Sequence, residues 1–372
     1  MTLRIATYNV NNLFERARVM QLEGFSSQAS GILRDVQRLN ALFAKDSYAG
    51  SVGQKIKALL EKYDFQKPKG NPWFKINEVR GRLFRVKKKP SVAIELVAKG
   101  RQDWLGWVEL VRETADEAST ENTARVIQAV KPDLLCVVEV EDRLTLDRFN
   151  QHLLKPLHSQ YAHDMLIDGN DDRGIDVGLL SRFEIRSVHS HIDDTFTAAN
   201  GQLFPIFSRD CPEYEVALPG SQTLWMLCNH FKSKGYGAPA ENNAKRKRQA
   251  DRVRQILGRF NLSQDFVVVA GDFNDTPNSQ PLAGLLSAPG LFDVLDSNLL
   301  NGPRWTYQDG KDQIDYLLVS KALHDKLQKV GIERHGIFRA DNFNGQFPHF
   351  PQVTDKVTQA SDHAAVWADF KL

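Results

Sequence analysis

The segment VVVAGDFND, residues 267–275, places an apolar run directly before Gly271 and two carboxylates. A short apolar run that ends at turn residues is typical of a buried strand that stops abruptly. Gly, Asp and Asn are common turn residues, so an ordinary tight turn explains the polar tip, and the segment alone favours this interpretation. The alternative is that a buried strand delivers these polar groups to a binding or catalytic site.

The composition of the whole chain is that of a globular protein. Its 372 residues are 42% hydrophobic and 25% charged, with a formal net charge of +2. This composition supports a sizeable core and argues against disorder. The length is large for one domain but fits a large β sandwich with an insertion. The small net charge argues against a nucleic-acid coat protein, although it permits a locally basic groove.

The cysteines and the N-terminus indicate the compartment. Cys136, Cys211 and Cys228 are too few for a disulfide framework, and we interpret them as small core residues in a reducing environment. The N-terminal sequence lacks the features of a signal peptide. No apolar run approaches the roughly 20 residues that cross a bilayer. We therefore expect a cytoplasmic protein without a membrane partner, and the sequence implies no obligate protein partner.

Strand-like apolar runs recur along the chain, separated by turn-rich or helical segments. The clearest predicted strands are residues 3–10, 133–140, 177–182, 223–231, 266–271, 313–320 and 363–370. Apolar residues at helical spacing predict helices at 121–131 and 242–260. The second of these helices carries a heavily basic outer face, which suits either solvent or a polyanion.

The segment from about 16 to 120 has a different character. Between residues 45 and 101 it contains fifteen Lys or Arg against five Asp or Glu, and residues 78–110 alternate like strands of a small sheet. The charges form either a solvated face or an arm over a polyanionic substrate. Interleaved aromatic residues either pack in a core or stack on bases; they are Trp73, Phe74, Phe84, Trp104 and Trp107.

Polar residues with catalytic chemistry gather at the ends of the predicted strands. They are Asn9, Glu139, His230, Asp272, Asn274, Asp315, Asp362 and His363. If the first strands run toward one edge of the sheets and the last two return from it, all of these residues lie at the same rim. A random scatter of loop residues would instead populate both rims. The pattern therefore favours a site over a set of unrelated turns.

The chemistry of this set is specific. Carboxylate and amide oxygens without cysteine ligands suit Mg²⁺ or Mn²⁺ better than zinc. Crowded carboxylates repel one another, so a divalent cation is almost required to hold them together. Two histidines beside such a cation fit the in-line attack of water on a phosphate ester. A single histidine more often satisfies a local hydrogen bond, but two at one rim favour catalysis.

In these polar residues and the segments around them, the sequence resembles the endonuclease/exonuclease/phosphatase (DNase I-like) superfamily. The matching motifs occur in the family's order at both ends of the chain; they are TYNVNNLF (7–14), DLLCVVEVED (133–142), DRGIDVGLLSR (172–182), NHFKSKG (229–235), GDFNDTP (271–277), WTYQDGKDQIDYLLVS (305–320) and SDHAAVW (361–367). The resemblance implies an α/β (α+β) fold, a two-layer β sandwich flanked by helices. It also implies a single catalytic domain over 1–372, with a basic, partly β insertion at about 16–120.

The resemblance assigns a role to each matching residue. The implied metal-binding residues are Asn9, Glu139 and Asp362, with Glu139 rather than Glu141 as the direct carboxylate ligand. The implied catalytic residues are His230, Asp272, Asn274, Asp315 and His363. Asp272 would activate or position water and Asn274 would donate to the phosphate. His363, oriented by Asp315, would contact the scissile phosphate, and His230 would act near the leaving oxygen.

Further residues of the same motifs are expected to contact substrate: Arg173, Asp176, Asn229 and Lys232. For Arg173 a surface salt bridge is an equal alternative to a phosphate contact. The chain departs from the family in the long insertion between Asn9 and Glu139, and in Gln313, where many relatives carry Arg. Close analogies of substrate with those relatives are therefore weak.

These features and the resemblance predict a metal-dependent phosphodiesterase of the nuclease type, with Mg²⁺ or Mn²⁺ as cofactor and DNA or RNA as substrate. The basic helix around Lys245–Arg254 and the basic insertion favour a long polyanion. A phosphatase or phospholipase-type hydrolase on the same scaffold is the alternative, because a fold does not settle a substrate. A non-catalytic binding module is disfavoured by the intact polar set.

Overall fold

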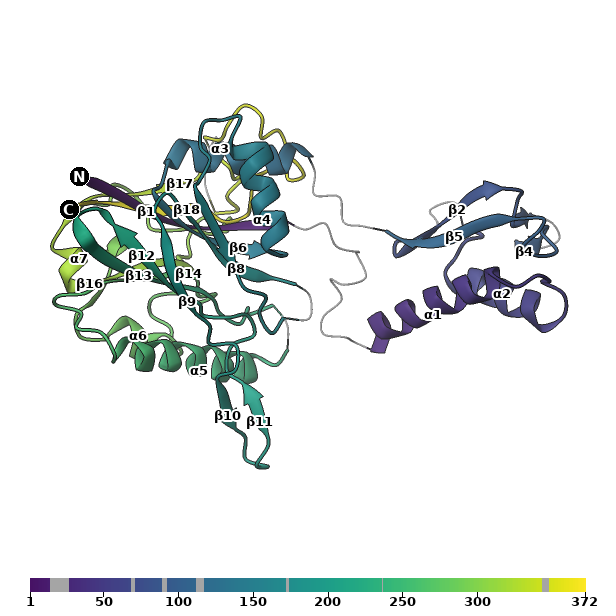
Figure 1. Ribbon diagram of the computed structural model, residues 1–372, viewed down its shortest axis with the longest axis horizontal. Coiled ribbons are helices and arrows are strands. Elements are labelled where there is room, and N and C mark those ends of the chain that lie inside the picture. The colour runs from purple at the N-terminus through teal and green to yellow at the C-terminus, as the bar shows by residue number, and fades with distance from the viewer. Residues whose placement is uncertain are drawn as a thin grey trace. The chain divides into compact units, whose positions relative to one another are not determined.

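The computed structural model describes residues 1–13, 27–67, 71–88, 92–111, 117–171, 174–235, 237–342 and 348–372. The chain forms two compact units (Figure 1). The larger unit comprises Met1–Phe14 and Thr114–Leu372, and the inserted unit comprises Glu15–Glu113. Each unit has a hydrophobic core of its own.

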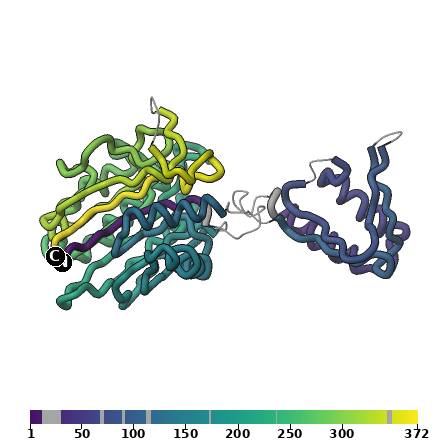
Figure 2. The backbone as a smooth tube through the Cα atoms, turned by 90° about the horizontal axis from the view of Figure 1, so that it is seen from above, coloured from purple at the N-terminus to yellow at the C-terminus, as the bar shows by residue number. Residues whose placement is uncertain are grey.

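Two six-stranded sheets make up the larger unit. The first has the strand order β17 (Leu327–Glu333), β18 (Ala365–Lys371), β1 (Thr2–Leu13), β6 (Leu134–Val140), β8 (Asp176–Ser181) and β7 (His163–Leu166). The second has the order β15 (Leu291–Asp293), β16 (Asp315–Ser320), β14 (Phe266–Asp272), β13 (Gln222–His230), β12 (Glu213–Leu218) and β9 (Ile185–His189). β1 pairs in parallel with β6 and antiparallel with β18, so the first and last strands of the chain lie side by side (Figure 2).

The core between the sheets follows from the two-residue period of a strand. Leu3 and Ile5 of β1 face Val268 and Ala270 of β14 across one continuous apolar cluster. Burying a Val, Leu or Ile side chain contributes about 1.5–3 kcal/mol. This shared core fixes one sheet against the other.

Helices cover the outer face of each sheet. On the first sheet these are α3 (Glu117–Val130), α4 (Arg143–Phe149) and the turn η2 (Asn150–Leu154); on the second they are α5 (Pro239–Leu257) and α6 (Ala283–Leu286). The remaining short elements are η3 (Pro219–Ser221), η4 (Val294–Asp296), α7 (Lys321–His324) and a hairpin of β10 (Thr195–Thr197) and β11 (Leu203–Pro205). The predicted two-layer sandwich flanked by helices is confirmed, as are all seven predicted strands and both predicted helices.

The three cysteines are free and buried, in agreement with their interpretation as core residues. In the described parts of the chain, no helix has both the length and the hydropathy that a membrane span requires.

The inserted unit contains more helix than the sequence indicated. α1 (Ser27–Phe43) and α2 (Ser51–Lys62) were not predicted, whereas the expected strands are present as β2 (Phe74–Arg80), β3 (Phe84–Lys87), β4 (Ala93–Leu96) and β5 (Leu105–Leu110). β2 pairs with β5, and β3 pairs with β4.

Core packing accounts for most aromatic residues of the inserted unit. Trp104 and Phe74 are buried, and Trp73 and Phe84 pack against the same core. Trp107 differs because its side chain is 47% exposed. Stacking on a base therefore remains an alternative for Trp107 alone.

Gly271 is required by the geometry at the end of β14. Its φ is +136°, and a Cβ added there would lie 1.8 Å from the carbonyl oxygen of Asn229 on β13. We expect Gly271→Ala to lower the free energy of unfolding by about 2–4 kcal/mol, since both the backbone and the neighbouring strand must shift.

Denaturant unfolding measures this loss, with Gly302→Ala as the control. Gly302 also has a positive φ, +97°, but a Cβ there would meet nothing within 4 Å. The control is expected to lose only about 1 kcal/mol from backbone strain. Equal losses in the two variants would show that the contact with Asn229 does not matter.

Candidate active site

The candidate site lies where the inner faces of both sheets reach one rim. The alternation that buries Leu3 and Ile5 also turns Asn9 inward in the second half of β1. In β13 and β14 it turns His230 and Asp272 inward in the same way. The register places His230, Asp272 and Asp315 opposite one another on three neighbouring strands. Strand periodicity therefore brings four of the predicted residues together.

Glu139 reaches the site only through a bulge in β6. Val138 packs into the inner core, whereas Val137 and Val140 both pack on the outer side, so the alternation is broken at Glu139. Glu139 has a φ of +68°, and the pairing of β6 with β8 shifts register between Val138 and Val140. Bulges of this kind re-aim a side chain. Here the Glu139 carboxylate is turned to accept a hydrogen bond from Asn9 Nδ2 at 3.2 Å.

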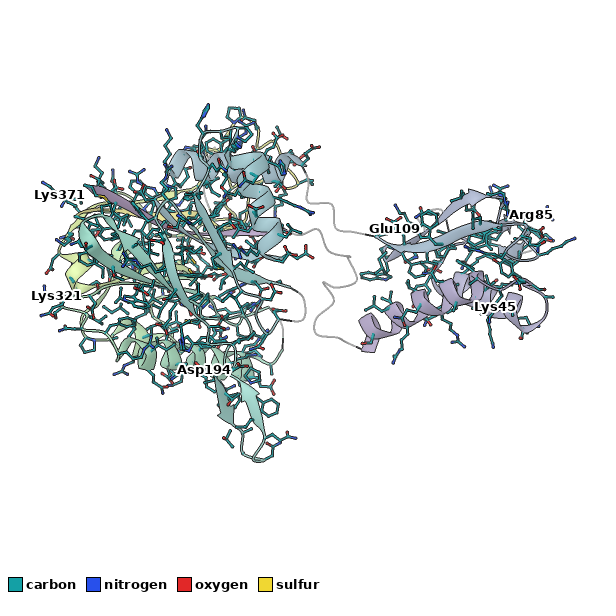
Figure 3. The ribbon with its side chains drawn as sticks, viewed as in Figure 1. Lys45, Arg85, Glu109, Asp194, Lys321 and Lys371 are labelled. Carbon is teal, nitrogen blue, oxygen red and sulfur yellow. The ribbon has the colours of Figure 1, made fainter. Side chains whose placement is uncertain are left out.

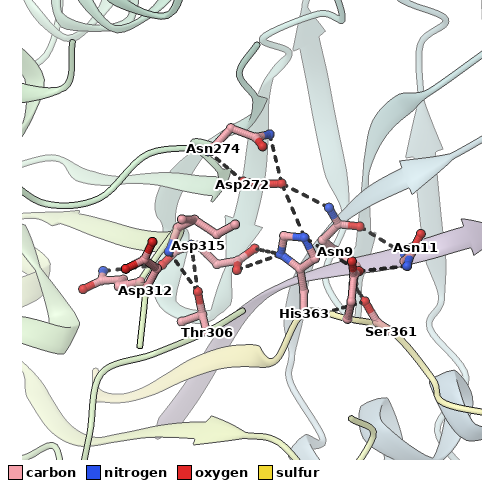
Figure 4. Close-up of polar contacts among 12 residues, drawn as sticks. Asn9, Asn11, Asp272, Asn274, Thr306, Asp312, Asp315, Ser361 and His363 are labelled. Atoms are coloured by element: carbon pink, nitrogen blue, oxygen red, sulfur yellow. Dashed lines mark hydrogen bonds and ion pairs between the residues drawn. The ribbon is translucent and has the colours of Figure 1, made fainter. Parts of the chain in front are cut away.

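Asp272 is the most highly connected carboxylate of the site (Figure 4). Its Oδ1 accepts the backbone N–H of Asn274 at 2.7 Å. Its Oδ2 accepts from the side-chain amides of Asn274 at 3.1 Å and Asn9 at 3.2 Å. The same Oδ2 lies 3.6 Å from His230 Nε2 and 3.9 Å from His363 Nε2. Asp272 is thus held rigidly between two imidazoles.

Burial raises the pKa of Asp272 to about 7. This value includes the nearby carboxylates of Asp315 and Glu139, which also raise the pKa, and the His363 imidazolium, which lowers it. Burial likewise raises the pKa of Glu139. Both carboxylates therefore have a free-energy cost of ionisation that a nearby cation would offset.

His363 and Asp315 form a buried pair. His363 Nδ1 donates to Asp315 Oδ2 at 2.9 Å, which directs Nε2 toward Asp272 and Asp362, each at 3.9 Å. Burial by itself lowers the pKa of His363. The carboxylates of Asp315 and Asp272 outweigh burial and raise that pKa well above its usual range. The ring is therefore positively charged at neutral pH.

Three groups of described side chains could hold a metal ion, and two of them contain Asp272. Glu139, His230 and Asp272 form one group; Asp272, Asp315 and His363 form the other, and in each the potential ligand atoms lie within 4.8 Å of one another. Desolvated carboxylates fit a hard divalent cation. Asn9 turns its amide nitrogen toward Glu139 and Asp272, and its oxygen accepts from Asn11 N at 3.0 Å. Asn9 would have to turn its amide to offer an oxygen to a metal.

Three supporting residues were not predicted. Asn11 donates to Asp362 Oδ1 at 2.8 Å. Ser361 Oγ donates to the Asn9 carbonyl at 2.8 Å and accepts the backbone N–H of His363 at 2.9 Å. Thr306 Oγ1 accepts the backbone N–H of Asp315 at 3.1 Å. All three lie within the matching motifs, but a short polar side chain in a loop gives no indication of its distant partner.

The expected substrate contacts have diverse surroundings. Asp176, at the start of β8, is buried and accepts from Gly169 N at 2.9 Å; burial raises its pKa to about 7. Asn229 lies on the opposite face of β13 from His230 and donates to the Leu227 carbonyl at 3.2 Å. Neither contact joins them to the Asp272 cluster.

The other two residues expected to contact substrate are Lys232 and Arg173. The backbone N–H of Lys232 donates to Gln249 Oε1 at 2.9 Å, which ties the end of β13 to α5. Arg173 lies outside the described residues.

GDFND forms both a turn and part of the site. Asn274 has a φ of +54°, in the left-handed region that Asn tolerates better than most residues. Its side chain donates to the Phe231 carbonyl at 3.2 Å and to Asp272. The two interpretations of this segment are therefore compatible.

Solved structures share the fold of this chain. An endonuclease/exonuclease/phosphatase family protein from Bacteroides thetaiotaomicron aligns over 100% of this chain and 99% of its own, with 13% identity and a TM-score of 0.50. A protein of the same description from Bacteroides vulgatus aligns over 69% and 91%, with 15% identity and a TM-score of 0.48. Truncated TDP2 from Caenorhabditis elegans aligns over 68% and 90%, with 18% identity and a TM-score of 0.43. A search of curated proteins found no match.

A family model matches the sequence itself over residues 107–363. The matched range covers well over half of the chain and contains Glu139, His230, Asp272, Asp315 and His363. Asn9 precedes the range, and β1 brings it to the same rim. The match supports a phosphoester hydrolase in general and confirms the resemblance drawn from the motifs. The chain belongs to the Endonuclease/Exonuclease/phosphatase family.

Proposed function

We propose that this protein is a divalent-metal-dependent phosphodiesterase that cleaves nucleic acid by in-line attack of an activated water, in the cytoplasm. The observation that carries the proposal is the position of the buried Asp272 carboxylate. Its Oδ2 lies within 4 Å of both His230 Nε2 and His363 Nε2. A base between two imidazoles provides for proton removal and charge stabilisation at one point.

Asp272 is suited to accept the proton of the attacking water. A general base works best when its pKa lies near the operating pH, and burial raises the pKa of Asp272 to about 7. The amides of Asn9 and Asn274 hold the carboxylate in place. Fixed orientation of this kind lowers the entropic cost of reaching the reactive geometry.

The charged His363 ring would stabilise negative charge on the phosphoryl oxygens. Asp315 holds Nδ1–H and leaves Nε2 to face the substrate. His230, on the other side of Asp272, would act near the leaving oxygen. Asn274 would donate to the phosphate once substrate displaces one of its present contacts.

Glu139 and Asp362, with the Asn9 amide turned over, are the residues that would hold the cation, for which we propose Mg²⁺ with Mn²⁺ as a substitute. A bound cation neutralises phosphate charge and polarises the phosphoryl group. The raised pKa of Glu139 agrees with this role, because burial penalises its charge in the absence of a cation. Oxygen ligands without cysteine favour Mg²⁺ over zinc.

A nucleic-acid substrate is supported by the charges on α5. Its sequence PAENNAKRKRQADRVRQIL has a strongly basic stretch, and its Gln249 is hydrogen-bonded to the backbone of Lys232 next to His230. Lys and Arg that neutralise phosphates supply most of the non-specific affinity for nucleic acids. The inserted unit is also rich in Lys and Arg. Lys232, Arg173 and Asp176 are our candidates for substrate contacts, and Asn229 is a weaker one.

Nicking of supercoiled plasmid tests the proposal. We expect cleavage with Mg²⁺ or Mn²⁺, none with EDTA, and none with Asp272→Ala or His363→Ala. Asp325→Ala is the matched control, since Asp325 is an exposed carboxylate paired with Lys321. It should cleave like the unmodified protein.

Absence of plasmid and oligonucleotide cleavage would overturn the nuclease assignment. If the same preparation released phosphate from a small phosphomonoester, the phosphatase alternative would replace it. Cleavage that survives both substitutions would instead show that the chemistry lies elsewhere in the molecule.

A further inference from the structure

Lys245 on α5 is a partly buried lysine among other cations. In the described part of the molecule it forms no hydrogen bond or ion pair, whereas Lys247 on the same helix pairs with Asp251 at 2.6 Å. Burial lowers the pKa of Lys245, and repulsion by Arg209 and Lys232 lowers it further. The Asp171 carboxylate raises this pKa, but it pairs with Arg209, and burial and the surrounding cations prevail.

This basic group adjoins the candidate active site. Arg209 Nε lies 3.1 Å from Asp171 Oδ2. The positive charge of Arg209 also lowers the pKa of Glu139. A Cβ on Gly169 would lie 2.8 Å from Arg209 Cα and 2.7 Å from Asp176 Oδ1, so these segments are closely packed beside the start of β8. Arg209 therefore acts electrostatically on both Lys245 and Glu139 of the candidate site.

An aromatic stack continues from the same helix. The guanidinium of Arg248 lies 4.1 Å from the centre of the Phe196 ring in β10. The centres of the Phe196 and Phe204 rings lie 6.0 Å apart, and the two ring planes are tilted by 32°. Phe204, on β11, is the outer member and is 43% exposed, and the adjacent Leu203 is 65% exposed. The stack thus ends in an open aromatic surface.

The hairpin that carries this stack is fixed at its base. It projects from the body of the larger unit beside α5 (Figure 1). Asp194, at its base (Figure 3), pairs with Arg252 of α5 at 2.7 Å and accepts the backbone N–H of Ile206 through its carbonyl at 2.8 Å. The contacts of Phe196 with Arg248 and of Asp194 with Arg252 therefore hold the hairpin against the helix that carries Lys245.

We propose that Lys245 and Phe204 form a subsite for an unpaired nucleic-acid strand, in which Lys245 binds a backbone phosphate and Phe204 stacks on a base. The subsite rests on the proposed function and specifies its substrate. A lysine without a partner supplies the charge that a phosphate requires, and an exposed ring supplies a stacking platform. Only an unstacked base offers its face, so the subsite selects single-stranded segments over a continuous duplex.

Anisotropy of a labelled oligonucleotide tests the subsite with the full chain in EDTA, where no cleavage occurs. The probe is a single-stranded DNA of roughly 12 nucleotides, compared with its blunt duplex over about 50–200 mM salt. Lys245→Ala should weaken single-strand binding and reduce the slope of log K against log[salt] by about 0.7. Phe204→Ala should weaken binding by about 5- to 100-fold without changing that slope.

Conservative and matched variants separate this role from a structural one. Lys245→Arg and Phe204→Trp should restore binding. Lys321→Ala, on an exposed lysine of α7 that pairs with Asp325, should leave both the affinity and the salt slope near those of the unmodified protein. Circular dichroism verifies that each variant is folded. A Lys245→Ala slope and a Phe204→Ala affinity that match the unmodified protein would overturn the subsite, and equal losses on the duplex would overturn its selectivity.

The same preparation of unmodified protein is assayed for hydrolysis of bis(4-nitrophenyl) phosphate with Mg²⁺ or Mn²⁺. Hydrolysis together with unchanged binding by the variants would leave the proposed function intact and reject the subsite. Absence of both hydrolysis and oligonucleotide binding would reject the proposed function and the subsite with it.

Discussion

Asp272→Asn is expected to lower kcat/KM for phosphodiester hydrolysis by about 10²–10⁴-fold, because an amide cannot accept the proton of the attacking water. The substitution preserves the size of the side chain, so loss of activity reports on the carboxylate. Steady-state kinetics on a small diester and on an oligonucleotide measure the effect. Both substrates should lose the same factor, since the base acts on the water and not on the remainder of the substrate.

The same substitution should change how stability depends on pH in EDTA. Because the folded-state pKa of Asp272 is raised to about 7, the folded protein binds more protons than the unfolded chain between about pH 4 and pH 7. The free energy of unfolding therefore falls as the pH rises through this window, by up to about 1.4 kcal/mol per pH unit from this group. Asp272→Asn removes that contribution.

Urea unfolding at several pH values in EDTA measures this difference. Asp325→Asn, on an exposed carboxylate, should keep the pH dependence of the unmodified protein. An Asp272→Asn variant with full activity would refute the assignment of a base. An unaltered pH dependence would show that Asp272 is ionised in the folded protein without a cost.

The pair formed by His363 and Asp315 leads to the second large effect. His363→Ala should lower kcat by about 10²–10⁴-fold, through loss of the charge that faces the phosphoryl oxygens. Asp315→Asn should lower kcat less, because the ring remains and only its charge and orientation are weakened. The Asp315 substitution should have little further effect in the His363→Ala background, as expected for residues that act as a unit.

Asp315 is a positioning residue, and NMR titration of His363 distinguishes this role from a structural one. The pKa of His363 is raised well above its usual range by Asp315 and Asp272, so Asp315→Asn should move it downward. His335→Gln serves as the control. Because His335 is exposed and pairs with Glu333, its replacement should leave the pKa of His363 unchanged. A His363 pKa unaffected by Asp315→Asn, or fully additive losses of kcat, would contradict the pairing.

The sequence was sufficient for seven strands of the larger unit and for part of the site, whereas β7, β9, β10, β11, β12, β15 and β17 were not predicted. Apolar runs marked β1, β13 and β14. The two-residue period of a strand is a local property that continues from the buried apolar positions to the polar residues that follow them. Asn9, His230 and Asp272 therefore face inward for the same reason as Ile5, Cys228 and Ala270. The motifs in their order were sufficient for the family.

Other features could not be predicted because they depend on residues far apart in the chain. Regular alternation along β6 would turn Glu139 away from the core, and only the bulge, with its shifted pairing to β8, directs it to the site. Ser361 bridges to Asn9 across most of the chain. α1 and α2 were not predicted, because the many Lys and Arg of the insertion and the strand-like alternation of residues 78–110 gave no indication of a helix.

The sequence alone thus determined the seven strands that carry the motifs, the inward side chains of β1, β13 and β14, and the family of the chain. The tertiary structure decided the register of β13, β14 and β16, which aligns His230, Asp272 and Asp315 across the sheet. It also decided the direction of the Glu139 side chain and the contact of α5 with the β10–β11 hairpin. The reason is physical. Periodicity is set by covalent geometry within a strand, whereas register, bulges and contacts between elements are set by the neighbours against which each strand or helix packs.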